Sequence, residues 1–342
     1  MTRVGVIGLG MMGGTHLDVY AKRDDVEIVA ISDINPNRLS GEELAIGNIE
    51  GQAAGGFDIR GASVKRYDEG KKLIRSKQVD LVDVCLPTPL HVAYAKAALR
   101  AGKHVMVEKP VGRTYREARK LVDHAEQAST FTMVGMCMRF WPGWTWLKDA
   151  VDDGRYGKVR AAAFQRLSTH PGGPFYRDGE ACGGALLDLH VHDTDFVYYL
   201  WGVPDRVSST GYSTITGETD HLMTTYHYDS NGPALVTAEG GWSFADGYPF
   251  TMRYTVNFER ATAVFDAGAA DPLVVHQPDQ PSQTVNLEPG MGYDHELAYF
   301  LDCIRSGRKP TTVTVADAIV GIKIAEAERK SVLTGRPVKI RR

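Results

Sequence analysis

Apolar residues along the first third of the chain follow two patterns that alternate. Short runs are continuously or alternately apolar, which predicts buried strands at 4–7, 26–31, 79–86 and 104–108. Between them, apolar residues recur three and four positions apart, which predicts helices at 91–101 and 114–128. Repeated units of strand and helix predict a parallel sheet with right-handed crossovers.

Further segments of this part are assigned from composition. Residues 37–46 and 67–76 are expected to be helical, and the glycine-rich stretch 47–61 is expected to form a surface loop. The sequence Pro87-Thr88-Pro89 predicts a turn, because proline lacks the N–H that a strand ladder requires. Gly102 is expected to end the helix before it.

A glycine motif follows the first predicted strand directly, in the sequence Gly8-Leu9-Gly10-Met11-Met12-Gly13. Gly8 permits a tight turn, Gly10 lets the backbone approach a pyrophosphate, and Gly13 lets helix and strand pack closely. The next helix offers its N–H groups and partial positive charge to phosphates. Because the second strand then ends at an acid, Asp33, the motif has its full context and predicts a dinucleotide site rather than a purely structural turn.

Asp33 favours NAD over NADP. A carboxylate at the end of the second strand accepts hydrogen bonds from the adenosine ribose and repels a 2′-phosphate. Arg38, five residues on, is able to contact a phosphate, but Asp33 is expected to lie closer to the ribose. The alternative for Asp33 is an ordinary turn residue at a strand end.

The pattern changes near residue 130. Short strands separated by Gly, Asn and Pro are expected at 159–166, 207–213, 223–228, 235–242, 252–258 and 262–265. One helix at 185–201 interrupts them, and another at 315–333 closes the chain. An α/β fold is therefore predicted, with a dinucleotide-binding Rossmann domain over 1–128. An α+β domain over 129–342, with a largely antiparallel open sheet, is expected to bind substrate and form oligomer contacts.

Composition adds mainly exclusions. The 342 residues are 43% apolar and 24% charged, as in ordinary soluble proteins. The net charge of −3 gives no electrostatic reason to expect nucleic acid or an anionic membrane as partner, and no apolar run reaches membrane-spanning length. Four cysteines without C-x-x-C spacing are expected to be free thiols. The first strand leaves no room for a signal peptide, so a cytoplasmic location is expected.

The strand ends of the first domain are the places where ligands of doubly wound sheets bind. One of them carries Glu108-Lys109-Pro110, and another carries Leu86-Pro87-Thr88. Lys109 is expected to point into the crevice that holds a nicotinamide, where a desolvated ammonium can donate or relay a proton. The alternative is a solvated surface lysine.

A second group of candidate residues runs from Gly183 to Asp195. Its apolar continuation favours a helix, in which Asp188 and His192 share a face with Asp195 while His190 points elsewhere. An Asp one turn before a His can orient the imidazole to accept a proton, although a buried structural hydrogen bond is the alternative. Only as a strand would this segment resemble a metal site, so no metal is expected.

Two candidates carry less weight. The aromatic run 140–146 is able to wall a sugar site or to pack in the core, and core packing is favoured. Arg139 and Arg166 are able to reach phosphate or substrate hydroxyls, although ordinary salt bridges are the default for both.

Taken together, these stretches resemble the Gfo/Idh/MocA family of glucose-fructose oxidoreductase, inositol dehydrogenase and rhizopine-catabolism proteins. The resemblance spans essentially the whole chain, and the run 101–110 (Ala-Gly-Lys-His-Val-Met-Val-Glu-Lys-Pro) is highly specific. The other matching residues are Gly8–Gly13, Pro87–His91, Gly183-Gly184 with Asp188 and His192, Tyr293–Glu296, Phe300, Gly307, Pro310 and Asp317-Ala318. Cys137 and His190 depart from the pattern, because they stand where the family commonly has Asn and Gly.

The resemblance implies that Lys109, Asp188 and His192 form the catalytic group. These three and Arg139 are the expected substrate contacts. The expected NAD site comprises Gly8, Gly10, Met11, Met12, Gly13, Asp33, Ile34, Arg38, Leu86, Pro87, Thr88, His91, Glu108, Lys109, Arg166 and Tyr293. A homodimer or homotetramer built on the open face of the second sheet is expected by resemblance alone.

The expected activity is NAD-dependent oxidation of a secondary hydroxyl of a sugar, cyclitol or polyol, or the reverse reduction of a ketone. His192 would accept the hydroxyl proton, oriented by Asp188, while Lys109 would hydrogen-bond the oxygen and relay the proton. Two alternatives stay open. One is a glycosidase that keeps NAD bound and oxidises its sugar transiently, and the other is a non-catalytic, sugar-sensing regulator.

Overall fold

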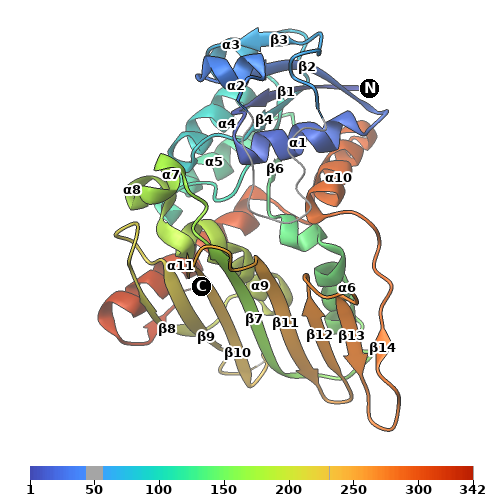
Figure 1. Cartoon of the computed structure of the whole chain (residues 1–342), viewed down its shortest axis with the longest axis vertical. Helices are drawn as coiled ribbons and strands as arrows, with labels where there is room; N and C mark the ends of the chain where they lie inside the picture. The colour runs from blue at the N-terminus through green and yellow to red at the C-terminus, as the bar shows by residue number, and fades with distance from the viewer. Residues whose placement is uncertain (44–56, 231, 342) are drawn as a thin grey trace. The chain divides into compact units, whose positions relative to one another are not determined.

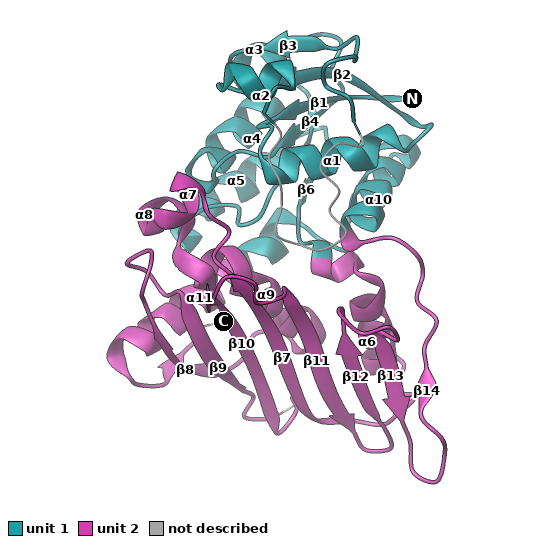
Figure 2. Ribbon diagram, in the orientation of Figure 1, with its two compact units in different colours: residues 1–137, 293–319 teal, residues 138–292, 320–342 magenta. Residues whose placement is uncertain are grey.

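The computed structural model describes residues 1–43, 57–230 and 232–341 (Figure 1). Two compact units share these residues (Figure 2). Unit 1 comprises 1–137 and 293–319, and unit 2 comprises 138–292 and 320–342. The division differs from the predicted one at residue 128, because the chain returns to unit 1 over residues 293–319 before it ends in unit 2.

The returning segment contains helix α10 (Gly292–Ser306), which is held to the rest of unit 1 by side chains. Arg305 lies 3.6 Å from the carboxylate of Asp25, and the ring of Tyr293 lies 6.5 Å from that of His16. From the sequence, this segment is recognised only through its resemblance to the family, at 293–296 and the residues after it. Its buried residues Leu297, Phe300 and Leu301 recur at helical spacing, which is the signal that predicts a helix here.

Unit 1 contains a six-stranded parallel sheet in the order β3-β2-β1-β4-β5-β6, which confirms the predicted Rossmann domain. Its strands are β1 (Thr2–Ile7), β2 (Val26–Ser32), β3 (Lys65–Tyr67), β4 (Leu81–Val84), β5 (His104–Val107) and β6 (Thr132–Val134). The strands β1, β4 and β5 are neighbours and run in the same direction. Their carboxyl ends therefore meet at one edge of the sheet.

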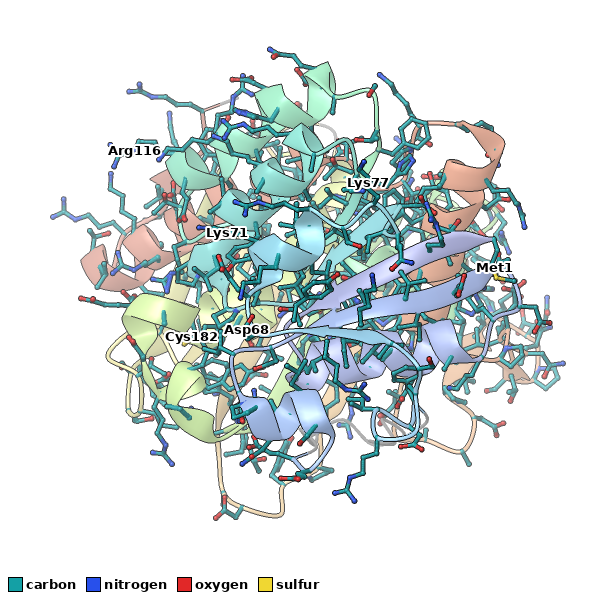
Figure 3. All side chains as sticks on the ribbon, turned by 90° about the horizontal axis from the view of Figure 1, so that it is seen from above. Met1, Asp68, Lys71, Lys77, Arg116 and Cys182 are labelled. Carbon is teal, nitrogen blue, oxygen red and sulfur yellow. The ribbon has the colours of Figure 1, made fainter. Side chains whose placement is uncertain are left out.

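The helices of unit 1 are α1 (Met11–Ala21), α2 (Pro36–Ser40), α3 (Gly70–Ile74), the short 3₁₀ helix η1 (Thr88–Leu90), α4 (His91–Arg100) and α5 (Tyr115–Gln127), together with α10. They all contain buried residues except α2, which has none. The Thr114 side chain caps α5 by accepting from the N–H of Glu117. Charged side chains such as Lys71 and Arg116 are exposed on these helices, and Lys77 is exposed just beyond α3 (Figure 3).

Two predicted helices of unit 1 are wrong in extent. The helix expected at 37–46 ends at Ser40, because Gly41 adopts a left-handed conformation with φ of +79°. The helix expected at 67–76 begins only at Gly70, because the residues before it pair with β2 as β3. Of the predicted loop 47–61, only 57–61 belongs to the described residues, and it lies in turns and bends.

Unit 2 contains a nine-stranded sheet in the order β14-β13-β12-β11-β7-β10-β9-β8-β15. The pairing of β7 with β10 is parallel and the others are antiparallel, so the predicted antiparallel character is confirmed. The strands are β7 (Val159–Thr169), β8 (Arg206–Tyr212), β9 (His221–His227), β10 (Leu235–Phe244), β11 (Thr251–Phe258), β12 (Thr262–Asp266), β13 (Leu273–His276), β14 (Gln283–Thr284) and β15 (Val338–Lys339).

One face of this sheet carries the core of unit 2. Trp144 is fully buried, and its ring packs against Phe164 of β7, Tyr254 of β11 and Phe196 of helix α9 (Val191–Trp201). The predicted core role of the aromatic run is therefore confirmed for Trp144. Alternate residues of β11 are buried and exposed, so the opposite face of the sheet is left open in this chain (Figure 2).

Unit 2 contains more helices than the one that was expected to interrupt its strands. The additional ones are the 3₁₀ helix η2 (Cys137–Phe140), which begins at the unit boundary, α6 (Pro142–Asp152), α7 (Gly173–Arg177) and α8 (Gly179–Cys182). The helix predicted at 185–201 begins as a π-helix, η3 (Leu186–His190), before α9. The closing helix is confirmed as α11 (Val315–Thr334), which spans the unit boundary. Among the described residues, no helix combines the length and apolar character needed to cross a membrane.

Candidate active site

The glycine turn between β1 and α1 is closed on two sides and open on one. Gly8 has φ of +93°, and a Cβ there would lie 2.4 Å from the carbonyl oxygen of Cys85. A Cβ on Gly13 would lie 1.8 Å from the carbonyl oxygen of Gly8. On Gly10 the nearest atom would be a guanidinium nitrogen of Arg38, 3.9 Å away. The turn thus has a bare, accessible backbone at the N-terminus of α1, which fits a pyrophosphate.

Asp33 follows β2 and lies beside this turn. Its carboxylate accepts from the backbone N–H of Leu9 at 2.7 Å and of Asn35 at 2.8 Å. A carboxylate has more lone pairs than these two bonds use, so it retains capacity for ribose hydroxyls. Ile34 is 90% exposed, and the Arg38 guanidinium is held by Glu43 at 2.8 Å. The residues predicted for the adenosine end of NAD are therefore grouped around the turn.

His91 connects the ends of β4 and β5. Its two ring nitrogens lie within hydrogen-bond distance of the carbonyl oxygens of Leu86 and Pro110, and the ring is buried. Burial lowers the pKa of His91, although both carbonyls favour the charged form. His91 thus links the ends of the two strands that were predicted to border the cofactor. Thr88, which lies between Leu86 and His91 in the sequence, is also buried.

Lys109 follows β5 at the edge of the sheet where β1 and β4 also end. Its backbone N–H donates to a carboxylate oxygen of Glu108 at 3.0 Å, and its side chain is partly buried. The peptide bond to Pro110 is cis. This position agrees with a lysine that faces a cofactor bound at the strand ends.

A buried polar cluster in unit 1 was not predicted from sequence. His16 of α1 makes two contacts, Nδ1 with Asp83 at 2.8 Å and Nε2 with Glu108 at 3.2 Å. The hydroxyl of Tyr20 donates to Asp83 at 2.8 Å, and Glu296 of α10 is fully buried nearby. No short motif marks this cluster, because four distant segments supply it.

In unit 2, Asp188 lies in the π-helical turn η3 and His192 in the first turn of α9. His192 is 8% exposed and Asp188 is half-buried. The turn is held from outside the helix, because the N–H of Leu186 donates to the carbonyl of Thr219 at 3.2 Å. The loop before Thr219 is itself organised by Asp220, which accepts from the N–H groups of 214–216 and from Trp242.

His190, between them in sequence, faces the interior of unit 2. Its Nε2 lies 3.3 Å from Glu328 and 3.2 Å from the hydroxyl of Tyr226. The ring also packs on the backbone of Gly240, where a Cβ would lie 2.6 Å from its Nδ1. The prediction that His190 points away from the Asp188–His192 pair assumed one continuous α-helix. In the structure, Asp188 and His190 lie in the π-helical turn η3, and His192 lies in the first turn of α9.

Arg166 and Arg139 form buried ion pairs with the helix that carries His192. Arg166 donates to Asp193 at 2.8 and 3.2 Å, and Arg139 donates to Asp195 at 2.8 and 2.7 Å. The default interpretation of both arginines as salt-bridge residues is confirmed. Their predicted contacts with cofactor or substrate stay predictions.

The candidate residues therefore form two groups. Unit 1 holds the glycine turn, Asp33, the strand ends with Glu108 and Lys109, and Tyr293 on α10. Unit 2 holds Arg139, Arg166, Asp188 and His192. Each unit presents its group on regular elements, and the convergence of Lys109 with His192 stays a prediction.

The sheet order of unit 1, its open glycine turn and the acid after β2 define a dinucleotide-binding protein. The chain belongs to the oxidoreductase family with an NAD-binding Rossmann fold, GFO/IDH/MocA. The profile of that N-terminal domain matches residues 2–136, and the family's C-terminal domain matches 144–264.

Relatives of known name cover nearly the whole chain. A myo-inositol 2-dehydrogenase of Thermotoga maritima is 27% identical over 99% of this chain and 98% of its own length. The rhizopine catabolism protein MocA of Rhizobium meliloti is 27% identical over 95% and 93%. A levoglucosan dehydrogenase solved with NADH and levoglucosan superposes with a TM-score of 0.85 at 21% identity, over 100% of both chains, and so shares the fold.

Proposed function

We propose that this protein is an NAD-dependent dehydrogenase that oxidises a secondary hydroxyl of a sugar, cyclitol or related polyol, or reduces the corresponding ketone. The observation that carries the proposal is the edge of the unit 1 sheet, where Lys109 follows β5 at the same edge as the open glycine turn after β1. Relatives named as inositol dehydrogenases align along the whole chain and support the substrate class.

NAD fits the residues of unit 1. Gly10 leaves the backbone open to the pyrophosphate, α1 supplies its N-terminus, and Asp33 has lone pairs for the ribose hydroxyls. The same carboxylate disfavours the 2′-phosphate of NADP. When bound, the nicotinamide supplies the hydride acceptor.

The chain's own residues move the proton and stabilise charge. His192 accepts the proton of the substrate hydroxyl, and Asp188 orients the imidazole for this role. Lys109 donates a hydrogen bond to the same oxygen, where negative charge develops as the carbon–hydrogen bond breaks. The alcohol thereby loses one proton and one hydride and becomes a ketone.

The test is a panel of sugars and inositols assayed with the purified protein and NAD, with NADH absorbance as the readout. We expect at least one secondary alcohol to reduce NAD. Lys109→Ala and His192→Ala should each lower kcat by about 10²–10⁴-fold, because each removes a proton-transfer or charge-stabilising group.

The matched controls are Lys120→Ala and His276→Ala, which remove an exposed lysine and an exposed histidine. Both should leave kcat unchanged. Near wild-type turnover in Lys109→Ala and His192→Ala would refute the assignment. Sugar cleavage without net NADH would indicate the glycosidase, and NAD binding without turnover of any kind would indicate the regulator.

We also propose that the chain forms a homodimer or homotetramer through the open face of the unit 2 sheet. Small side chains form a row across four strands of that face, since Thr255, Ala163, Thr237 and Thr225 are register partners. A flat surface of this kind lets a second sheet approach closely.

A further inference from the structure

Glu296 is a carboxyl group in an unusual position. It lies on α10 with none of its surface exposed, and neither of its side-chain oxygens has a hydrogen-bond partner among the described residues. An ionised carboxylate in such a place is strongly disfavoured unless it binds a cation, whereas a protonated one is neutral.

The groups that face Glu296 come from three other elements. From α1 they are His16 and Tyr20, from β4 it is Asp83, and from the end of β5 it is Glu108. Cys85, which follows β4, contacts His16 and Asp83. One ligand-type atom each of His16, Glu108 and Glu296 lies within 4.8 Å of the other two. Two carboxylates and an imidazole therefore already surround the carboxyl group of Glu296.

His16 accounts for one of the protons in this cluster. Nδ1 forms a hydrogen bond with Asp83 at 2.8 Å, whereas Nε2 lies 3.2 Å from a Glu108 oxygen at ion-pair distance but without hydrogen-bond geometry. Two carboxylates this close to the ring favour its charged form. Burial disfavours that charge, but the nearby carboxylate of Asp83 outweighs it, so the pKa of His16 lies well above its ordinary value. His16 therefore balances one of its two carboxylate neighbours.

Glu296 accounts for the other proton. Burial, and then the charge of Glu108, raise the pKa of Glu296 well above its ordinary value. Adding a third carboxylate charge to a site with one imidazolium would leave two negative charges unbalanced. The neutral acid avoids this.

We propose that Glu296 is a carboxylic acid that stays protonated at neutral pH, and that Glu296 and the His16 imidazolium together hold Glu108 as the residue that positions Lys109. The part that concerns Lys109 rests on the proposed function, whereas the protonation of Glu296 does not.

Glu108 is placed to act on its neighbour. One of its oxygens accepts from the backbone N–H of Lys109 at 3.0 Å, and the other faces His16 at 3.2 Å. Gly135 leaves room for this carboxylate, because a Cβ there would lie 2.9 Å from its Oε1. Loss of the His16 charge, or a negative charge on Glu296, would therefore change the electrostatic surroundings that keep Glu108 at this position, next to the lysine.

The protonation of Glu296 is tested with Glu296→Gln, which keeps the shape and cannot ionise. A group whose pKa is raised in the folded state costs stability as pH rises above its ordinary value, because the unfolded chain then releases the proton. From pH 5 to 8 the stability of Glu296→Gln relative to wild type should therefore rise, by about tenfold in unfolding equilibrium constant per pH unit until the folded pKa is reached. Urea unfolding at each pH measures this.

The control is Glu126→Gln, which neutralises an exposed glutamate of α5 and should show a flat difference over the same range. A flat difference for Glu296→Gln would overturn the proposal, because it means that Glu296 is ionised in the folded state. So would a Zn²⁺-dependent rise in the Tm of wild type that Glu296→Gln abolishes. If the variant fails to fold, ¹³C-glutamate NMR of wild type decides, since one carboxyl resonance should stay in the protonated position at pH 7.

The positioning role of Glu108 is tested by a double-mutant cycle on kcat. Glu108→Gln should lower kcat by about 10²-fold with little change in KM for substrate, as expected for a misplaced catalytic group. When Lys109 is already replaced by Ala, Glu108→Gln should lower kcat hardly any further, because Glu108 acts on kcat only by positioning the Lys109 side chain. A full additional loss in the Lys109→Ala variant would refute positioning. No effect of Lys109→Ala alone would instead refute the proposed function.

Discussion

Gly13 and Gly14 are adjacent in the first turn of α1 but meet different surroundings. A Cβ on Gly13 would lie 1.8 Å from the carbonyl oxygen of Gly8, whereas a Cβ on Gly14 would have nothing within 4 Å. Backbone lies opposite Gly13, so no side-chain rotation can relieve the clash. The third glycine of the motif is thus fixed by helix packing against the turn rather than by the ligand.

We expect Gly13→Ala to destabilise the protein by about 3 kcal/mol and to weaken NAD binding, because the turn must open to admit the methyl group. Gly14→Ala is the matched control and should be neutral or stabilising by up to about 1 kcal/mol, because alanine favours the helix. Urea unfolding and titration with NAD measure both effects. Equal stability of the two variants would contradict the packing explanation.

At the residue scale, the sequence predicted those residues whose role follows from a local pattern. The glycine turn and Asp33 lie within one strand–helix–strand unit, and spacing alone identifies them. His16 and Glu296 could not be found in this way. A histidine inside an ordinary helix and a glutamate in a polar stretch give no sign of burial, and their contacts join segments that are far apart in the chain.

At the scale of elements, α9 is anchored by charge rather than by apolar contacts alone. Asp193 and Asp195 follow His192 in the first turns of this helix and are buried. Each carboxylate accepts two hydrogen bonds from one arginine. Arg166 also lies over the ring of Trp144, 5.4 Å from its centroid. The helix that carries the candidate base is thereby tied to β7 and to the segment before α6.

We expect Arg166→Met to lower the free energy of unfolding by about 3–5 kcal/mol, because it leaves the buried carboxylate of Asp193 without its partner. The control is Arg206→Met, which breaks an ion pair with Asp229 that is exposed at the surface, and should cost at most about 1 kcal/mol. Chemical denaturation compares them. Similar costs for both variants would argue against a buried pair.

Helices and strands were predicted well where one spacing of apolar residues continued along the segment, and less well where that spacing changed. The strands that were predicted in both sheets follow their apolar spacing closely, as do α5 and α11, whereas the strands β3, β6, β13, β14 and β15 were not predicted. Helix α6 was missed because the aromatic run 140–146 was interpreted only as core packing or, less favoured, as a sugar-binding wall, although Pro142 in its first turn is a helix-start signal. The residues of the π-helical turn η3 are of types that also occur in an α-helix, so the sequence could not distinguish the two conformations.

At the scale of the whole molecule, the open face of the unit 2 sheet is a regular surface that the described side chains leave uncovered. Along its central strands it carries the exposed Ala163 and Thr255 and the half-buried Thr237, which offer no charge against self-association. One neighbouring row is polar, with Gln165 donating to Glu239 at 2.7 Å. A face of this kind suits a symmetric contact with a second copy.

We expect Ala163→Arg to shift the protein toward monomer, because it places a long charged side chain at the centre of the proposed contact. The control is Arg160→Ala, which removes a charge from an exposed position near the start of β7 and should leave the assembly intact. Light scattering coupled to size-exclusion chromatography gives the mass of each. An unchanged mass for Ala163→Arg would refute this contact.

The return of the chain to unit 1 sets an order on its biosynthesis. When β6 leaves the ribosome, the six-stranded sheet is complete, yet the helix that covers His16 and Glu108 has still to be translated. Until residues 293–319 emerge, the nascent Rossmann unit carries an uncovered pair of ionisable groups beneath its nucleotide turn. Every strand of the second sheet except β15 must therefore be synthesised before the first unit can close, and unit 2 is completed only after that, when residues 320–342 emerge.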